Sequence, residues 1–285
     1  MDIKKVGVVG CGLMGSGIAE VSARAGYDVI VSEVNDQFLQ KGLERIKNSM
    51  AKGVKREKLS QAEMDEALGR IKGTTDLKDF RDRDLVIEAI IENMEEKKKV
   101  FAALDEICPP HAILASNTSS LSVTEMASVT KRGSQVLGMH FFNPVPVMKL
   151  LEFVRTILTS DETMETAQQF GASLGKTMIT AKDMPGFIVN LLLIPFLLDT
   201  VRALQDGLAT KEDIDTGIKL GLNHPMGPLT LLDFVGLDTT LYIADAMFEE
   251  FKDTRYAAPP LLRRMVMAGH LGRKTGKGFY DYGEK

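Results

Sequence analysis

Short apolar runs alternate with segments of helical periodicity over the first half of the chain. Apolar runs bounded by turn residues are typical of buried strands, and apolar positions three and four apart are typical of helices. This alternation predicts an α/β fold, a Rossmann-type doubly wound sheet whose strands are mostly parallel. The expected strands are 6–9, 27–32, 84–90, 112–115, 136–142 and 150–154, and the expected helices are 14–25, 36–50, 61–70 and a segment ending near 107.

The pattern changes at Lys182-Asp183-Met184-Pro185-Gly186, where a Pro-Gly pair interrupts the chain. Only helical patterns follow, so we expect two domains, residues 1–184 and an all-α domain of residues 185–285. The first half of the helix expected at 187–206 is apolar nearly all round, which requires burial in its own domain or against a second subunit. A homodimer through the helical domain is therefore expected. The other helices are expected at 211–220, 228–235, 238–251 and 259–268.

Composition narrows the class of protein. A chain of 285 residues with 44% hydrophobic and 26% charged residues is typical of a soluble two-domain protein. A net charge of −4 argues against binding of nucleic acid. The two cysteines, Cys11 and Cys108, lack metal or redox spacing, and the four histidines lack ligand spacing, so no metal is expected. With no targeting segment and no apolar run long enough for a membrane span, a cytoplasmic protein is expected.

A glycine loop, Gly10-Cys11-Gly12-Leu13-Met14-Gly15, lies between the first expected strand and the first expected helix. In this context G-x-G-x-x-G is typical of dinucleotide binding. Gly10 permits the tight turn, Gly12 lets the backbone approach a pyrophosphate, and Gly15 lets the helix pack closely. The alternative, a glycine-rich turn without a ligand, is the weaker interpretation in this context.

Glu33 ends the second expected strand, 23 positions after Gly10. A carboxylate at this place can accept hydrogen bonds from the ribose hydroxyls of adenosine and would repel a 2′-phosphate. The next residues, Val34 and Asn35, supply no positive charge to neutralise that phosphate. The cofactor is therefore expected to be NAD rather than NADP.

His140 is the candidate for proton transfer, and Glu152 follows on the next expected strand. A histidine that pairs with a carboxylate can move a proton near neutral pH. Asn143-Pro144-Val145-Pro146 forces a turn after His140, which places the imidazole at a strand end, where open α/β sheets bind ligands. Together with the glycine loop, this predicts an oxidoreductase that interconverts an alcohol and a ketone.

Several motifs together resemble one enzyme family over nearly the whole chain. They are Gly10-Cys11-Gly12-Leu13-Met14-Gly15, Glu88-Ala89-Ile90-Ile91-Glu92-Asn93, Ser116-Asn117-Thr118-Ser119-Ser120-Leu121, His140-Phe141-Phe142-Asn143-Pro144, Pro185-Gly186-Phe187-Ile188-Val189-Asn190, His224-Pro225-Met226-Gly227-Pro228 and Gly272-Arg273-Lys274-Thr275-Gly276. The chain resembles the L-3-hydroxyacyl-CoA dehydrogenase family in its short bacterial form. The resemblance implies an NAD-binding domain, a helical dimerising domain and an acyl-CoA substrate, with acetoacetyl-CoA and 3-hydroxybutyryl-CoA as the expected pair.

The resemblance also assigns roles to residues. His140 is similar to the family's catalytic acid/base and Glu152 to its orienting partner, while Ser119 and Asn190 resemble the groups that hold the substrate oxygens. The positions that resemble the family's cofactor contacts are Gly10, Gly12, Leu13, Met14, Gly15, Glu33, Glu92, Lys97, Ser119, Asn143 and Lys274. The candidates for contact with the CoA phosphates are Ser49, Lys52, Lys55 and Arg56, in a basic segment that could equally be an ordinary exposed helix.

Structural alternatives remain open for several of these residues. Ser119 could cap a helix that starts near Val123. Asn190 could be bonded to backbone inside its apolar helix, and Glu152 could be a surface strand residue. Lys97 stands in a charged run, Glu95-Glu96-Lys97-Lys98-Lys99, typical of a solvated helix face.

Two other functions remain open as well. One is a dehydrogenase of a free hydroxy acid or sugar acid such as L-gulonate, which would keep the fold and change the substrate. The other is a protein that binds NAD without catalysis, which would have no chemical reason to keep His140, Glu152, Ser119 and Asn190 together.

Overall fold

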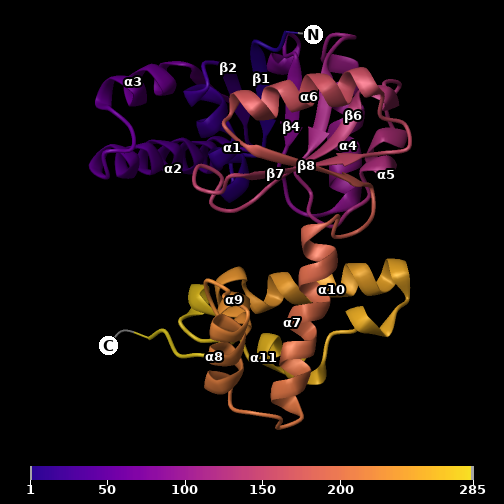
Figure 1. The fold of residues 1–285 in the computed structure, drawn as a ribbon. Helices are drawn as coiled ribbons and strands as arrows, with labels where there is room; N and C mark the ends of the chain where they lie inside the picture. The colour runs from indigo at the N-terminus through magenta and orange to yellow at the C-terminus, as the bar shows by residue number, and fades with distance from the viewer. Residues whose placement is uncertain (1, 284–285) are drawn as a thin grey trace. The chain divides into compact units, whose positions relative to one another are not determined.

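The computed structural model describes residues 2–283 and divides the chain into two compact units, residues 1–184 and 185–285. The first unit is built on a sheet, and the second unit is helical (Figure 1).

The described part of the first unit contains an eight-stranded sheet with the order β3-β2-β1-β4-β5-β6-β7-β8. Its strands are β1 (Lys5–Val9), β2 (Asp28–Ser32), β3 (Ile71–Thr74), β4 (Leu85–Glu88), β5 (Ile113–Ser116), β6 (Val136–Phe141), β7 (Leu150–Arg155) and β8 (Thr177–Lys182). All neighbouring strands are parallel except β6 and β7, which are antiparallel. The predicted doubly wound, mostly parallel sheet is confirmed.

Helices cover both faces of this sheet (Figure 1). They are α1 (Leu13–Arg24), α2 (Asp36–Lys55), α3 (Gln61–Gly69), α4 (Met94–Ile107), α5 (Val123–Ser128) and α6 (Asp161–Ser173), with short 3-10 turns η1 (Leu77–Phe80) and η2 (Gly133–Gln135). Ile18 of α1 and Phe170 of α6 share one buried apolar cluster with Val8 and Leu151 of the sheet. The central strands β4 and β5 are buried at every position, and therefore on both faces, which is why they appear in the sequence as continuous apolar runs.

Three elements of the first unit carry little apolar periodicity and were not predicted: β3, α6 and β8. The helix α5 begins at Val123, where a helix was considered as the one that Ser119 could cap. The strands β3 and β8 form the two edges of the sheet and are half exposed, so they lack a continuous apolar run. The buried face of α6 includes Thr163, Thr166 and Gly171, which weakens its helical pattern of apolar residues. In addition, α2 continues to Lys55, beyond its predicted end at residue 50.

The second unit consists of α7 (Val189–Gln205), α8 (Lys211–Gly221), α9 (Pro228–Val235), α10 (Leu237–Phe251) and α11 (Pro260–Met267), with 3-10 turns η3 (Thr254–Tyr256) and η4 (Arg273–Thr275). Its core includes Leu198 of α7 and Leu232 of α9. Within this chain the first half of α7 is only partly covered, because Leu192 is 70% exposed. None of the helices in residues 2–283 combines the length and hydrophobicity that a bilayer span requires.

A buried carboxylate on α9 anchors the last described segment of the chain. Asp233 is 1% exposed and accepts hydrogen bonds from the backbone N–H groups of Phe279 and Tyr280 at 2.8 and 2.9 Å. The hydroxyl of Tyr282 donates to the same carboxylate at 3.0 Å. These bonds hold the turn that carries Lys274 against α9.

Candidate active site

The glycine loop connects β1 to α1 with the geometry that its spacing predicts. Gly10 has φ +95°, a conformation that side chains disfavour, and a Cβ on Gly15 would collide with the carbonyl oxygen of Gly10. Gly12 is the N-cap of α1, and a Cβ there would meet no protein atom within 4 Å. The space beside Gly12 is therefore open to a ligand at the start of the helix, where backbone N–H groups lack partners within the helix.

Glu33 directly follows β2 and braces this loop. Its Oε1 accepts the N–H of Cys11 at 2.8 Å, and its Oε2 accepts the N–H of Val34 at 3.2 Å. Burial raises the pKa of Cys11 to about 12, and the charge of Glu33 adds to the effect, so Cys11 stays a neutral thiol. The carboxylate thus stands beside the loop that is expected to receive the cofactor. Arg45 of α2 was not among the predicted site residues; its guanidinium donates to the carbonyl of Cys11 at 3.0 Å.

Exposed apolar side chains follow the carboxyl ends of three parallel strands. Leu13, Val34 and Ile91 follow β1, β2 and β4 and are 60%, 80% and 70% exposed. Large apolar side chains so exposed at the ligand-binding edge of an open sheet suit contact with flat rings such as adenine and nicotinamide. Met14, beside Leu13, is half-buried.

His140 and Glu152 lie directly opposite each other on the antiparallel strands β6 and β7. The Nδ1 atom of His140 is 2.9 Å from Oε2 of Glu152. Glu152 is fully buried and His140 is 6% exposed, so the pair is shielded from water. The alternative that Glu152 is a surface strand residue is wrong. The register explains the contact, because residues twelve apart become cross-strand neighbours when the connection between the two strands turns back.

Glu92 holds the residues Thr118 and Ser119, called here the Ser119 segment, through hydrogen bonds. The Oε1 atom of Glu92 accepts the N–H of Ser119 at 3.1 Å and also a hydrogen bond from the hydroxyl of Thr118. The α5 helix is capped by Ser122, whose hydroxyl accepts the N–H of Glu125 at 3.2 Å. The alternative role of Ser119 as that cap is therefore wrong.

Lys97 is buried, unlike its neighbours in the charged run. It is 1% exposed, and its Nζ lies 2.7 Å from Oε1 of Glu88 and 3.1 Å from Oε2 of Glu92. The solvated-face alternative is wrong for Lys97. A signal was present in the sequence, since Lys97 shares a helix face with Phe101 and Leu104, which are both buried. No role was predicted for Glu88, the other carboxylate that contacts Lys97.

A cavity of about 870 Å³ lies between α1, α2 and the segment 143–147. Asn143, Ser49, Lys52 and Arg56 line it, and Lys55 does not. The charged lining is mostly basic, with Arg24, Lys41, Arg45, Lys52, Arg56 and Lys58 against Glu20 and Glu44. A basic cavity in a chain of net charge −4 is suited to phosphate groups.

Two of the predicted site residues belong to the second unit. Asn190 is half-buried in the first turn of α7. Lys274 lies in η4, and its Nζ is 2.6 Å from the carboxylate of Asp238. The contacts that the structure shows among predicted residues thus join His140 to Glu152, and Glu92 to Lys97 and Ser119, all in the first unit. Within residues 2–283, no group of three His, Cys, Asp or Glu side chains could hold a metal ion.

Comparison with known proteins agrees with this geometry. The sheet and its glycine loop define the first unit as a dinucleotide-binding domain of the dehydrogenase type. A family model described as the NAD binding domain of 3-hydroxyacyl-CoA dehydrogenase matches residues 5–184, and the model of the C-terminal domain matches residues 186–282. The chain belongs to the 3-hydroxyacyl-CoA dehydrogenase family. The predicted family, the NAD-binding domain and the oxidoreductase class are confirmed.

Individual relatives match over the full length. A 3-hydroxybutyryl-CoA dehydrogenase of Mycobacterium tuberculosis is 51% identical, with 98% of this chain and 99% of the relative covered. The mitochondrial hydroxyacyl-coenzyme A dehydrogenase of Sus scrofa is 43% identical, with coverages of 98% and 91%. The crystal structure of (S)-3-hydroxybutyryl-CoA dehydrogenase from Ralstonia eutropha superimposes with a TM-score of 0.95 at 46% identity and covers 99% of this chain and 100% of that one.

Proposed function

We propose that this protein interconverts (S)-3-hydroxybutyryl-CoA and acetoacetyl-CoA with NAD(H), and that His140 is the acid/base. The observation that carries the proposal is the buried contact between His140 and Glu152, 2.9 Å apart. A bound NAD would supply the acceptor or donor of a hydride. The open space beside Gly12 and the carboxylate of Glu33 fit this cofactor, and Leu13, Met14 and Gly15 belong to the same loop.

The role of each side chain in the proton transfer follows from that contact. Glu152 engages Nδ1 of His140, so Nε2 is the nitrogen that takes the proton of the C3 hydroxyl during oxidation and returns it during reduction. Glu152 orients the ring and stabilises the imidazolium as it forms. Ser119 and Asn190 would hold the substrate oxygens, and Glu92, Lys97, Asn143 and Lys274 would hold the nicotinamide side of the cofactor, as the family resemblance implies.

The basic cavity supports an acyl-CoA substrate. The CoA moiety carries phosphate groups, and Lys52, Arg56 and Ser49 present two positive charges and a hydroxyl to the cavity. Lys55 does not line this cavity, so we assign it no contact with CoA. The free-acid alternative offers no phosphate to this lining and is therefore the weaker candidate.

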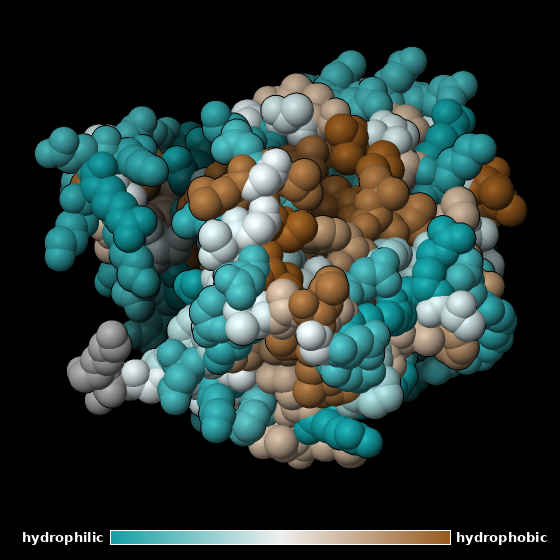
Figure 2. Space-filling model, turned by 60° about the horizontal axis from the view of Figure 1, so that its bottom comes forward, coloured by the Kyte–Doolittle hydropathy of each residue, from teal (hydrophilic) through white to brown (hydrophobic). Residues whose placement is uncertain are grey.

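We also propose that the protein forms a homodimer through the second unit. Figure 2 shows hydrophobic side chains gathered in patches on one face of the molecule. The exposed large apolar side chains of the second unit include Leu192, Leu208, Leu220, Leu222, Phe234, Tyr242 and Met267. Sedimentation equilibrium should give the mass of a dimer, and a monomer at micromolar concentration would refute this part. We place the protein in the cytoplasm because both cysteines are free thiols.

The proposed function is tested by a spectrophotometric assay of four combinations. Each of the two cofactors, NADH and NADPH, is assayed with acetoacetyl-CoA and with a longer 3-ketoacyl-CoA. We expect turnover with NADH and acetoacetyl-CoA, and much weaker turnover with NADPH because of Glu33. Activity on free hydroxy acids without activity on CoA thioesters would favour the alternative substrate class. NADH binding with no turnover of any substrate would indicate a non-catalytic protein.

A further inference from the structure

Glu88 is a buried carboxylate at the carboxyl end of β4, and the proton-transfer mechanism does not use it. It is fully buried. Its Oε1 accepts Nζ of Lys97 and the N–H of Ile90, both at 2.7 Å, and its Oε2 accepts the hydroxyl of Ser116 at 2.7 Å. One side chain thus joins the end of β4, the end of β5 and the helix α4.

Two chains of hydrogen bonds lead from Glu88 to the Ser119 segment. One runs through Lys97 to Glu92, which accepts the N–H of Ser119 at 3.1 Å. The other runs through the hydroxyl of Ser116, which accepts the N–H of Thr118 at 3.1 Å. The first route ends on the backbone of Ser119, which carries the proposed oxygen-binding hydroxyl, and the second ends on the preceding residue, Thr118.

The positions of Lys97 and Glu92 depend on the negative charge of Glu88. Lys97 is buried between two carboxylates, and a buried ammonium requires such partners. If Glu88 lost its charge, the carboxylate of Glu92 would be the remaining charged partner within 4 Å of Lys97 among the described residues. Glu92 also holds Ser119 and Thr118, so a shift of Glu92 toward the ammonium would move the Ser119 segment.

We propose that Glu88 is a positioning residue that acts through Lys97 and, by the second route, through Ser116. It holds Lys97 so that Glu92 and the Ser119 segment keep the geometry needed beside the nicotinamide ribose and the substrate hydroxyl. This inference rests on the proposed function, because it takes Glu92, Lys97 and Ser119 as site residues.

The test compares Glu88→Gln with Asp84→Asn, a matched loss of carboxylate charge at the other end of the same strand. In Glu88→Gln we expect kcat/KM for acetoacetyl-CoA to fall about tenfold to a hundredfold. A displacement of about 1 Å near a reacting centre has an effect of this size. The dissociation constant of NADH should rise at the same time. In Asp84→Asn both values should stay within about twofold of wild type. Unchanged values in a folded Glu88→Gln protein would overturn the proposal.

A double-variant cycle separates positioning through Lys97 from a general structural role. In a Lys97→Met background, Glu88→Gln should have a smaller further effect on kcat/KM than in the wild-type background, because only the route through Ser116 remains. A full additional loss in that background would overturn the proposal. Should Glu88→Gln fail to fold, Ser116→Ala removes one of the same hydrogen bonds without a change of charge. It should lower kcat/KM about threefold to tenfold, and wild-type kcat/KM would overturn the proposal.

Failure of the proposed function would be seen in the wild-type protein as absence of turnover with acetoacetyl-CoA and NADH. The NADH dissociation constant of Glu88→Gln then carries the test by itself, because Glu92 and Lys97 are assigned to the cofactor. A rise of about tenfold would support the positioning role, and an unchanged constant would refute it.

Discussion

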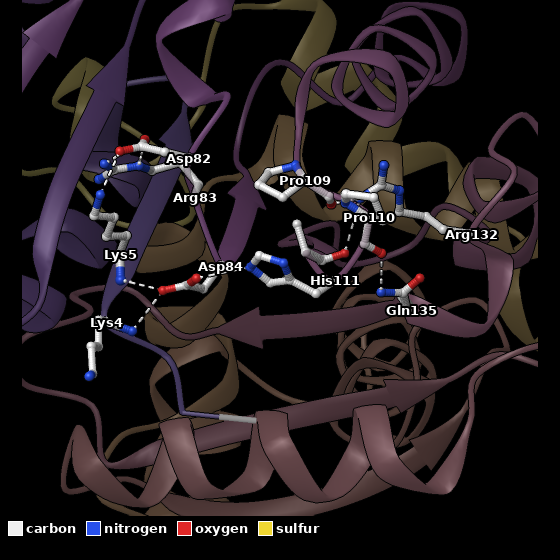
Figure 3. Close-up of polar contacts among 11 residues, drawn as sticks. Lys4, Lys5, Asp82, Arg83, Asp84, Pro109, Pro110, His111, Arg132 and Gln135 are labelled. Carbon is white, nitrogen blue, oxygen red and sulfur yellow. Dashed lines mark hydrogen bonds and ion pairs between the residues drawn. The ribbon is translucent and has the colours of Figure 1, made fainter.

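The two ends of β4 each carry a carboxylate that accepts several hydrogen bonds, but the surroundings of the two groups differ. At the amino end, Asp84 accepts the N–H groups of Lys4 and Lys5 at 2.9 and 2.8 Å, and the ring of His111 points toward it (Figure 3). The side chain of Asp84 is 18% exposed and His111 is 53% exposed. At the carboxyl end, Glu88 is fully buried and is linked to Lys97.

The polar side chains near Asp84 form hydrogen bonds with backbone atoms and with one another. Arg132 donates to the carbonyl oxygen of Pro109, and Gln135 donates to that of Pro110 (Figure 3). Arg132 also donates to the carbonyl oxygen of Cys108. The groups around Glu88 lead instead to Ser119, on the edge of the sheet where the glycine loop lies. We infer that similar hydrogen-bonding chemistry serves stability at the amino ends of the strands and the proposed site at their carboxyl ends, because ligands of open parallel sheets bind beyond the carboxyl ends.

Glu152→Gln is expected to have the largest effect among the variants that sharpen this comparison. The amide keeps the volume of the side chain but cannot stabilise the imidazolium of His140, so kcat should fall about a hundredfold or more. The dissociation constant of NADH should change by less than about threefold. Steady-state kinetics with NADH titration by fluorescence measures both, and an equal loss in binding and turnover would contradict the role given to Glu152.

Lys52→Ala and Arg56→Ala should raise the KM for acetoacetyl-CoA about threefold to tenfold, because each removes a charge from the cavity lining. Lys55→Ala is the matched control on the same helix and should leave KM unchanged. The effect of the first two variants should shrink at high salt. Equal increases of KM in all three variants would indicate a general electrostatic attraction of the substrate instead of a CoA site.

Asp84→Asn should lower the free energy of unfolding by about 1–2 kcal/mol, because hydrogen bonds to a charged acceptor become hydrogen bonds to a neutral one. Its kcat/KM should stay near the wild-type value. Urea unfolding and the standard assay measure the two quantities. A loss of turnover in this variant, without a loss of stability, would contradict the different roles given to the two ends of β4.

The smallest effect concerns the pH dependence of stability at the Asp84 edge. Burial acts to raise the pKa of Asp84, but hydrogen bonds from the N–H groups of Lys4 and Lys5, and from His111, outweigh it and hold the pKa below its usual value. A lowered folded-state pKa gives stability that is present above the unfolded-state value, about 3.9, and is lost as pH falls through the folded-state pKa. The difference in unfolding free energy between wild type and Asp84→Asn should be fully present at about pH 5 and shrink as the pH falls below about 4. A difference that grows on acidification would contradict this sign.

Much of the fold follows from local sequence patterns, since buried parallel strands and the glycine loop are continuous in the chain. The contact between His140 and Glu152 was predicted from the family resemblance, and the antiparallel register of β6 and β7 gives its physical cause. The burial of Lys97 was not predicted, because a run of five charged residues hides the one that lies on the apolar face of α4. The roles of Glu88 and Arg45 depend on partners from other elements, which a single sequence does not identify.

The most direct test of the account is a stopped-flow measurement of NADH oxidation by acetoacetyl-CoA in His140→Gln, beside Asp84→Asn. We expect His140→Gln to bind NADH with near wild-type affinity and to lose at least about a hundredfold in the rate of the chemical step, while Asp84→Asn keeps the wild-type rate. A near wild-type rate in His140→Gln would contradict the assignment of proton transfer to the carboxyl edge of the sheet.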